Sequence, residues 1–387
     1  MGVCCGGRYR LLARSTAKYG SMVVMVEMLI LGAVGALDVF VFFRLHVAFR
    51  RLSIPADLPV DTDLPTVSIC IAARNETHAM TQCLERVVAS EYPKLEVIVL
   101  DDGSRDDTSV LIKSFAHAGV RFVEGRPLPE DWLGKNYAQS LLADEASGKY
   151  ILFMDVDTLI DRHTVARAVS YMLHHKAKMI SVVPLRNDDW QTVTIMTTMR
   201  YYWAMVRFTP THPRAVANAW LIERQLMLNE LESDISLRKS MLMETTIARK
   251  LAATKEYRLI LGNQWLGVRS EKPWSAQVET SVRLLYPQCD AFWLQVIWLV
   301  VLLCATLIPY AMVWWEPLAG ILIALQFLVA YYYFNHMWVR YSVVGALLLP
   351  ITITQEIALL LVSLYQYKLG VVTWKGRPIR SGKAIKS

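Results

Sequence analysis

The sequence predicts a two-part protein: an α/β domain with a mostly parallel sheet covered by helices on both faces, and transmembrane α-helices attached to it. Between residues 66 and 185, short apolar runs that end in turn-type residues alternate with helical patterns, as they do around buried parallel strands. Elsewhere the chain carries apolar runs long enough to cross a bilayer. Hydrophobic residues make up 54% of the 387 residues and charged residues only 19%, which fits a chain partly in lipid.

A basic segment over residues 1–21 precedes the first predicted transmembrane helix, residues 22–43. No small-residue cleavage site follows this run, so we expect an uncleaved anchor. The run contains Glu27 and Asp38, and their spacing of eleven residues brings both to nearly the same helix face. We expect that face to turn toward other helices or a polar cavity. Residues 44–65 are a connector, basic at first and then rich in Pro and Asp.

A cytosolic α/β domain with interfacial helices is expected over residues 66–285. Its predicted strands are Val67–Ala72, Leu95–Leu100, Val120–Val123, Tyr150–Met154 and Ile180–Leu185. Its predicted helices are Met80–Ala89, Thr108–Ala118, Asn136–Ala146, Arg162–His175 and Met241–Ala253. The stretch Gln191–Phe208 has mixed periodicity and many aromatic residues, which indicates an amphipathic helix lying near the bilayer.

Membrane sequence fills residues 291–366, and a basic tail follows over residues 367–387. The predicted spans are Ala291–Trp315, Pro317–Phe334 and Tyr341–Tyr365. One span before the domain and three after it would place the tail opposite the domain, whereas charge favours the cytoplasmic side for both. Either one segment does not span, or Pro350 breaks the last into a re-entrant piece.

The net charge of +7 does not indicate a nucleic-acid partner, because the basic residues flank apolar spans instead of covering one folded face. Six cysteines are scattered without a CxxC pair, which favours reduced thiols and a cytoplasmic main domain. We therefore expect an integral membrane protein whose partners include the lipid bilayer.

Two acidic clusters follow predicted strands, Asp101–Ser104 after one and Asp155–Asp157 after another. Ligands of open α/β sheets bind beyond the carboxyl ends of the strands, so both clusters should meet at one crevice. Asp155 and Asp157 can aim two carboxylates at one hard cation, Mg²⁺ or Mn²⁺, which then bridges nucleotide phosphates. Taken singly, the first cluster is also a good turn and the second a turn with a helix cap.

Three further positions complete the expected site. Residues 72–76 end the first strand with polar side chains, as the two acidic clusters end theirs. Lys135 precedes a helix and can meet a phosphate there, although an exposed lysine at a helix start would look the same. Glu244 sits at the start of a helix, where a carboxylate is favoured in its ionised form and can accept a proton from a hydroxyl. A plain helix N-terminal charge is the alternative for Glu244.

These motifs together resemble a membrane-bound family 2 glycosyltransferase with the Rossmann-like GT-A fold, in the branch of ceramide glucosyltransferases and hopanoid- and carotenoid-associated enzymes. The resemblance runs from about Val67 to Arg283. Asp101–Ser104 and the Asp155/Asp157 pair match intact motifs, and Pro129–Lys135 is similar to the branch's Pro-x-x-Trp-x-Gly-Lys signature. Residues 72–76 match Pro-Ala-Arg-Asn-Glu except for the missing proline.

The base region and the tail depart further from the pattern. Glu244 stands where the branch usually has Asp, and Met243 replaces the acidic residue before it. No QxxRW motif follows, which argues for transfer of a single sugar. Arg269, Trp274 and Arg283 occupy its region and are possible diphosphate or acceptor contacts. In the tail, Val372–Arg377 is similar to the terminal Trp-Lys-Gly-Arg of the branch, which implies that the tail lies near the active site.

The resemblance implies a metal-dependent inverting glycosyltransferase that moves one sugar from a nucleotide sugar, expected to be a UDP-sugar, to a membrane lipid. It implies a catalytic base at Glu244 and a cation, Mg²⁺ or Mn²⁺, on Asp155 and Asp157. The implied nucleotide-sugar contacts are Ala72, Arg74, Glu76, Asp101, Asp102, Lys135 and Asp155. Alternatives are a polyprenyl-phosphate sugar synthase, whose acceptor needs no base, and a non-catalytic sugar-nucleotide-binding membrane protein.

Overall fold

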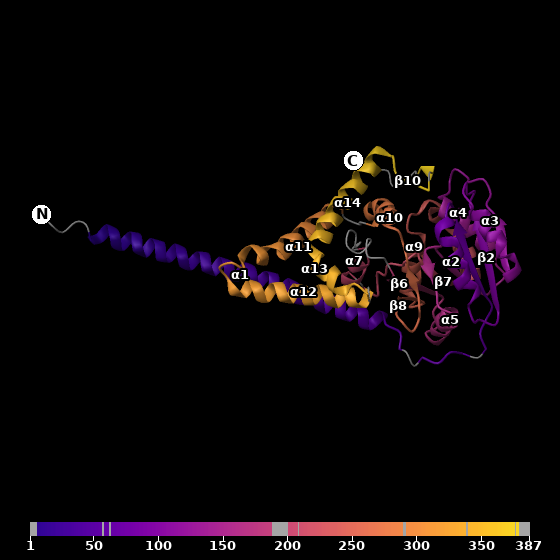
Figure 1. Cartoon of the computed structure of the whole chain (residues 1–387), viewed down its shortest axis with the longest axis horizontal. Helices are drawn as coiled ribbons and strands as arrows, with labels where there is room; N and C mark the ends of the chain where they lie inside the picture. The colour runs from indigo at the N-terminus through magenta and orange to yellow at the C-terminus, as the bar shows by residue number, and fades with distance from the viewer. Residues whose placement is uncertain are drawn as a thin grey trace.

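A computed structural model describes residues 6–55, 58–61, 63–187, 200–207, 209–288, 292–337, 340–375 and 377–378. An α/β domain occupies one end of the molecule, and long helices extend from it (Figure 1). The predicted fold class is confirmed: a mixed sheet carries helices on its faces, and four long apolar helices accompany it.

The sheet is ordered β3-β2-β1-β4-β7-β6-β9-β5, with β8 paired to β6. Strands β1 to β4 are parallel, and β7 runs antiparallel to both β4 and β6. The ends of β1, β2 and β4 therefore meet at one edge, as predicted for the two acidic clusters. The strands are β1 Val67–Ala73, β2 Leu95–Asp101, β3 Val120–Glu124, β4 Tyr150–Met154, β5 Thr158–Leu159, β6 Met179–Arg186, β7 Ala219–Glu223, β8 Tyr257–Gly262 and β9 Arg269–Ser270.

The domain contains the five helices predicted before and after residues 191–208, each to within a few residues, and further helices that were not predicted. The helices are α2 Thr77–Val88, α3 Thr108–Ser114, α4 Gly134–Glu145, α5 Thr164–His174, α7 Arg200–Val206, α8 Arg224–Ser233, α9 Met243–Ala253 and α10 Trp274–Gln288, with 3-10 turns η1 Ala116–Ala118 and η2 Ile235–Lys239. Of the helix expected over 191–208, α7 covers residues 200–206, whereas residues 191–199 and 208 lie outside the described part. Strands β5, β7, β8 and β9 and helices α8 and α10 were not predicted, because their apolar patterns are short or mixed.

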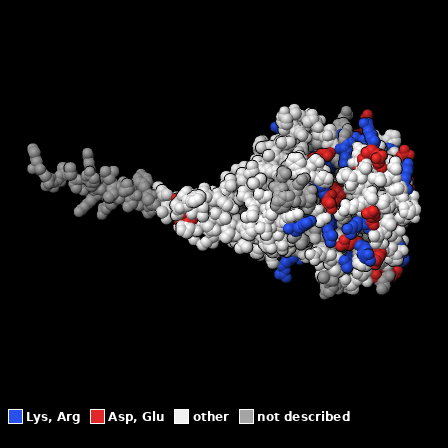
Figure 2. All heavy atoms as spheres, viewed as in Figure 1, with Lys and Arg blue, Asp and Glu red and all other residues white. Residues whose placement is uncertain are grey.

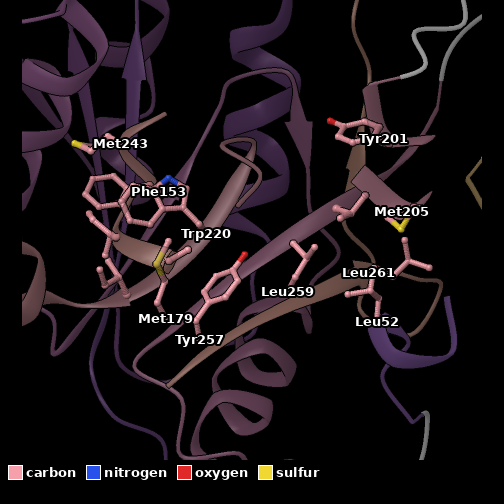
Figure 3. Close-up of a cluster of buried hydrophobic side chains, with 14 of the residues drawn as sticks. Leu52, Phe153, Met179, Tyr201, Met205, Trp220, Met243, Tyr257, Leu259 and Leu261 are labelled. Atoms are coloured by element: carbon pink, nitrogen blue, oxygen red, sulfur yellow. The ribbon is translucent and has the colours of Figure 1, made fainter. Parts of the chain in front are cut away.

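Two apolar layers pack on the two faces of the sheet, and the alternation of strand side chains sorts residues between them. In β1, Ile69 and Ile71 face the layer that contains α2 and α5, while Cys70 faces the other. That second layer includes Phe153 of β4 and Trp220 of β7, whose rings stack with centroids 4.6 Å apart. Figure 3 shows Phe153 and Trp220 beside each other with Met243 of α9 nearby.

The long apolar helices and the second layer form one continuous core. Helix α1 (Gly6–Leu52) buries Leu45 and Phe49 in that layer, and α12 (Pro317–Met337) buries Tyr333 there. Tyr333 packs edge to face on Tyr202 of α7 at 5.0 Å. Helix α1 thus continues through residues 44–52, which were expected to be connector, because its last turns have an apolar face that packs against the domain.

Four helices in the described part are long and apolar enough to cross a membrane: α1 over Met22–Leu52, α11 (Phe292–Met312), α12 and α14 (Leu349–Leu369). Their mean hydropathies are 2.2, 2.2, 1.7 and 1.3, so α14 is the least apolar. The predicted last span is broken at Leu348 into α13 (Ser342–Leu347) and α14, two residues before the expected break at Pro350. Figure 2 shows Lys, Arg, Asp and Glu gathered on the α/β domain, while the helical part is almost uncharged on this face.

The end of the chain returns to the α/β domain. After α14, a short antiparallel hairpin, β10 (Thr373–Trp374) and β11 (Arg377–Pro378), lies beside α10. Helices α1, α11 and α12 extend away from the domain to the same side, whereas α14 leads from α13 back to β10 (Figure 1). The hairpin and the α/β domain are thus in direct contact.

Candidate active site

A cavity of about 300 Å³ opens at the edge of the sheet where β4 ends. Its walls come from the N-terminus of α4, the segment before β7, the segment before α9, one face of α10 and the β10–β11 hairpin. Among the predicted site residues, Lys135, Asp155, Glu244 and Arg283 line it. These four residues are separated by up to 148 positions in sequence and are brought together by the sheet topology.

The ends of β1 and β2 form a polar wall next to this cavity. The Arg74 guanidinium donates to the backbone carbonyls of Asp102 and Gly103, which joins the two strand ends. Asp101 is buried and accepts hydrogen bonds from the hydroxyls of Ser104 and Ser109. Gly103 has φ +71°, a left-handed conformation that glycine adopts without a Cβ penalty, and this lets the chain turn back directly after the two aspartates.

Asp102 is buried and faces the tail. Its Oδ2 lies 2.6 Å from Arg377 Nη1 in the hairpin. Burial raises the pKa of Asp102, and the Arg377 and Arg74 charges oppose that rise. A Cβ on Gly134 would stand 3.2 Å from Arg377 Nη1 and 3.5 Å from Asp102 Oδ2, so the start of α4 approaches this pair closely.

Glu76, at the end of the β1 segment, also pairs with the tail. Its carboxylate lies 2.9 Å from Lys375 Nζ. Burial raises the pKa of Glu76, and the Lys375 charge opposes the rise. Lys375 further accepts a hydrogen bond at its carbonyl from Arg74 Nε at 3.2 Å. Two of the predicted nucleotide-contacting carboxylates therefore hold cations from the end of the chain.

The Asp155 and Asp157 carboxylates each face a lysine. Asp155 Oδ1 lies 2.6 Å from Lys135 Nζ, and Asp157 Oδ2 lies 2.8 Å from Lys272 Nζ. The Asp155 backbone is fixed by a 2.9 Å hydrogen bond from its N–H to the carbonyl of Asn218, just before β7. Asp155 itself lines the cavity, and the charge of Asp157 acts on Glu76 at the neighbouring strand end.

Glu244 lies in the first turn of α9, buried in the cavity wall. Burial raises the pKa of its carboxyl, and the positive charges of Lys135 and Arg283 oppose that rise. Its position relative to Lys135 is fixed by Asn136, whose side-chain amide donates to the carbonyls of Leu237 and Ser240 at 2.8 Å. The segment leading into α9 is thereby tied to the start of α4.

Three predicted residues belong neither to the cavity lining nor to the charged pairs beside it. Arg269, in β9, has its Nη2 3.6 Å from Asp161 Oδ2. Trp274 begins α10 and is 43% exposed. Ala72 pairs with Leu100 inside the sheet, and its side chain is only a methyl group. Arg283, in contrast, lines the cavity and stacks on the Trp374 ring at 5.3 Å.

The carboxylate oxygens of Asp155 and Asp157 are suitable ligands for a divalent cation that is also bound by a substrate. Asp155 and Asp157 offer hard carboxylate oxygens directly after one strand, and Mg²⁺ is commonly held by one or two carboxylates plus substrate phosphates. Among the described residues, no group of three or more His, Cys, Asp or Glu side chains could hold a metal by itself. The residues therefore fit a metal whose remaining ligands come from a bound diphosphate.

Sequence reasoning missed Lys272, the partner of Asp157, and gave no role to Lys375 or Arg377 individually. Lys272 follows a two-residue strand and carries no local motif, so only the tertiary pairing of β9 with β5 and β6 brings it to the site. For the tail, the Trp-Lys-Gly-Arg similarity was a usable signal, and its predicted closeness to the site agrees with the observed ion pairs.

Comparison with known proteins shows which family part of this chain resembles. Residues 68–223 match the family model described as Glycosyl transferase family 2, which covers β1 through β7 and ends before α9. Poly-beta-1,6-N-acetyl-D-glucosamine synthase of Staphylococcus epidermidis is 30% identical over 125 residues, or 32% of this chain and 29% of the relative. The synthase of that name from Staphylococcus aureus strain COL is 31% identical over 126 residues, with the same coverage.

The chain thus spans less than a third of the length of these curated relatives. Among solved structures, the mannosyltransferase PcManGT from Pyrobaculum calidifontis, in complex with GDP-Man and Mn²⁺, has a TM-score of 0.53 and 21% identity. The match covers 87% of this chain and 97% of that one, and at this identity it shows a common fold.

Proposed function

We propose, from the family 2 glycosyltransferase domain that residues 68–223 form, that this protein transfers a single sugar from a nucleotide sugar to a membrane lipid. The observation that carries the proposal is the shared cavity: Asp155 and Lys135 on one wall and the buried carboxyl of Glu244 on another. A diphosphate end and a proton acceptor within one pocket are what glycosyl transfer to a hydroxyl requires.

The donor lies across the strand ends in this proposal. The nucleoside and ribose meet Glu76, Asp101 and Asp102, and the diphosphate meets Lys135, Arg283 and the N-terminal amides of α4. A divalent cation on Asp155 and Asp157, when bound, offsets charge on the departing diphosphate. The complex of the mannosyltransferase PcManGT with GDP-Man and Mn²⁺ supports a divalent cation, and the UDP-sugar expectation rests on the motif resemblance.

The transfer step uses Glu244 as general base. The acceptor O–H proton passes to a Glu244 carboxylate oxygen while the acceptor oxygen forms a bond to the anomeric carbon. The bond from that carbon to the diphosphate oxygen breaks on the opposite face, so the configuration inverts and a nucleoside diphosphate leaves. A base whose pKa is raised by burial binds the proton more strongly than an ordinary glutamate would.

A lipid acceptor is supported by the position of the cavity next to the membrane helices. Its α10 wall packs on α14, and Leu284 of α10 and Tyr201 of α7 both line it. Tyr201 belongs to the same apolar layer as residues of α1 and α12. A hydroxyl dissolved in the bilayer can therefore approach Glu244 from the side. The resemblance to the ceramide glucosyltransferase branch points to the same acceptor class.

An even number of crossings after the domain follows from the hairpin. Because Arg377 contacts Asp102, hairpin and domain lie on one side of the bilayer. We therefore assign the two crossings to α11 and α12 and leave α13–α14 as the re-entrant or interfacial piece. The lower hydropathy of α14 and its buried Glu356 support this choice. We propose that this side is the cytoplasm, and the basic tail after α14 supports that orientation.

A second candidate is a polysaccharide synthase, which the names of the curated relatives favour. The missing QxxRW motif and the short match argue against it. Polyprenyl-phosphate transfer is the third candidate, and there Glu244 would be dispensable because a phosphate acceptor carries no proton to remove.

The test is transfer by the purified full-length protein in lipid nanodiscs, with labelled UDP-Glc, UDP-Gal, UDP-GlcNAc and GDP-Man and an extract of membrane lipids. The proposal expects one labelled lipid in the organic phase, carrying one sugar by mass spectrometry, that is lost with EDTA and with Asp155→Asn. Label in a long water-soluble polymer would instead establish the synthase. Full activity of Glu244→Gln on a polyprenyl phosphate would establish the third candidate.

A further inference from the structure

Both carboxylates of the Asp155–Asp157 pair are already neutralised by lysines. The Lys135–Asp155 pair has 25% and 31% of its side chains exposed, and the Lys272–Asp157 pair only 19% and 13%. At 2.6 Å and 2.8 Å, the ammonium groups contact one oxygen of each carboxylate, Asp155 Oδ1 and Asp157 Oδ2, and their charges lie where a cation would bind. The two lysines come from unrelated segments, α4 and the β9–α10 connection, so neither pair is a by-product of local helix geometry.

A divalent cation and these ammonium groups compete for one pair of carboxylates. Like charges at contact distance repel, and the repulsion is stronger in a partly buried pocket than in water. The chain offers no third acidic ligand in its described residues that would offset this cost. A nucleotide diphosphate offsets this repulsion, because it brings negative oxygens that can bind both the cation and the displaced ammonium groups.

The cavity shape allows this exchange. Lys135 and Lys272 both line the cavity, and Lys272 also borders a smaller pocket between β9 and α10. A lysine released from its aspartate therefore remains beside the space that the diphosphate would occupy. Its four-carbon stem permits that movement without a change in the backbone.

We propose that Lys135 and Lys272 close the metal site of the donor-free protein, so that the divalent cation binds only together with a nucleotide diphosphate. The inference rests on the proposed function. It couples the two binding equilibria: the factor by which the nucleotide raises the metal affinity equals the factor by which the metal raises the nucleotide affinity. Removing a lysine should strengthen metal binding without nucleotide and weaken nucleotide binding with metal.

The test measures Mn²⁺ binding to the full-length protein in nanodiscs by the electron paramagnetic resonance signal of free Mn²⁺, with no nucleotide, with UDP and with GDP. We expect the unmodified protein to bind Mn²⁺ at least about tenfold more tightly with its preferred nucleotide. This factor corresponds to a metal site that is open in about a tenth or less of the nucleotide-free molecules. Lys272→Gln and Lys135→Gln should each raise the nucleotide-free Mn²⁺ affinity about tenfold, whereas Lys272→Arg should not.

Two controls separate this effect from a simple loss of positive charge. Lys239→Gln removes a lysine that lines the same cavity but belongs to neither pair. Lys178→Gln breaks a 2.8 Å pair with Glu256 on another surface. Both should leave Mn²⁺ affinity unchanged, and thermal unfolding should show that every variant is folded.

Equal Mn²⁺ affinity with and without nucleotide in the unmodified protein would overturn the inference, as would Lys272→Gln and Lys135→Gln variants that behave like Lys239→Gln. In either case the proposed function would stand, since Mn²⁺ still binds. Absence of Mn²⁺ binding even with UDP or GDP would instead remove the metal from the proposed function and this inference with it.

Discussion

Glu244 combines a buried carboxyl with two nearby cations, and this balance sets when it can accept a proton. Burial disfavours the charged form and raises its pKa, while Lys135 and Arg283 favour the charged form. The folded state therefore binds a proton at Glu244 more tightly than the unfolded chain does. Stability from this group is fully present below the unfolded pKa and is lost as the pH rises through the folded one.

Glu244→Gln should therefore abolish transfer without harming the fold. The general-base contribution is typically about 10²–10⁴-fold, so kcat should fall by that factor. The neutral amide removes a buried charge, so the thermal midpoint at pH 7 should be unchanged or higher. Rates and calorimetric melting of the same preparation check both. A large loss of stability at pH 7 would contradict the assigned environment.

The pH profile gives an independent measure of the same group. As the pH falls through the raised pKa of Glu244, the base becomes protonated and kcat/KM for the acceptor should decline. The decline should begin above the pH range of an ordinary glutamate, whose pKa is about 4.3. Glu244→Asp, which keeps a carboxylate, should retain an acid limb. A rate that stays flat down to about pH 4.5 would exclude Glu244 as the base.

At the residue level, sequence reasoning could find the aspartates because each follows an apolar strand, and strand ends of a parallel sheet converge. Lys135 was found for a related reason, its place before a helix, although the structure pairs it with Asp155. Lys272 could not be found, since its role depends on a partner 115 positions away that only the folded sheet brings near. Arg269 and Trp274 were placed by analogy with a motif that this chain lacks, and neither lines the cavity.

Among the elements, the short β10–β11 hairpin contacts three residues of the candidate site. Arg377 forms an ion pair with Asp102, and Lys375 forms one with Glu76. The Arg283 guanidinium stacks on the Trp374 ring. An isolated hairpin this short has little stability of its own, so these contacts hold it in place. Ion pairs and ring stacking thus hold the hairpin as one wall of the proposed donor site.

Arg377→Gln should consequently weaken donor binding more than it slows the chemical step. Loss of a charge-assisted hydrogen bond to a buried carboxylate typically costs about 1.5–3 kcal/mol, which corresponds to a rise of about tenfold or more in donor KM. Steady-state kinetics with varied donor measures the split between KM and kcat. Arg121→Gln, which breaks an exposed pair with Glu145 at the far edge of the sheet, is the control and should leave both parameters unchanged.

Secondary structure was predictable where the apolar pattern was long and regular, as in β1, β2, β4, α11 and α12. The antiparallel strand β7 was not, because the segment before α8 reads equally well as loop or helix and is fixed by pairing with β4 and β6. The break between α13 and α14 was anticipated at Pro350. It occurs at Leu348 because proline is accommodated in the first turn of the helix that follows.

On the scale of the whole molecule, the long apolar helices and the sheet share one apolar layer, so the domain has a fixed orientation relative to those helices. Leu45, Phe49 and Tyr333 belong to the same cluster as Phe153 and Trp220. Domain and membrane helices should therefore unfold together, not as separate units. The hairpin contact agrees with the even number of crossings that the charge of the tail favours. Charge could not orient the first span, since basic residues flank it on both sides.

Cysteine labelling tests this topology. A membrane-impermeant maleimide should label Val371→Cys, just after α14, from the same side of sealed vesicles as Val110→Cys on the domain surface. Trp314→Cys, in the turn between α11 and α12, should be labelled from the opposite side. The parent protein supplies the background from its own thiols. Labelling of Val371→Cys and Val110→Cys from opposite sides would contradict the re-entrant assignment of α14.

The short distance in sequence between α14 and the hairpin has a consequence for the candidate site. Helix α14 ends at Leu369 and the hairpin begins at Thr373, so we expect a tilt of the helix to move the arginine that pairs with Asp102. Bilayer thickness and lateral pressure would then regulate how readily sugar nucleotide is captured. Protein extracted into a detergent micelle, where that pressure is gone, would report a weaker clamp than protein in its native lipid.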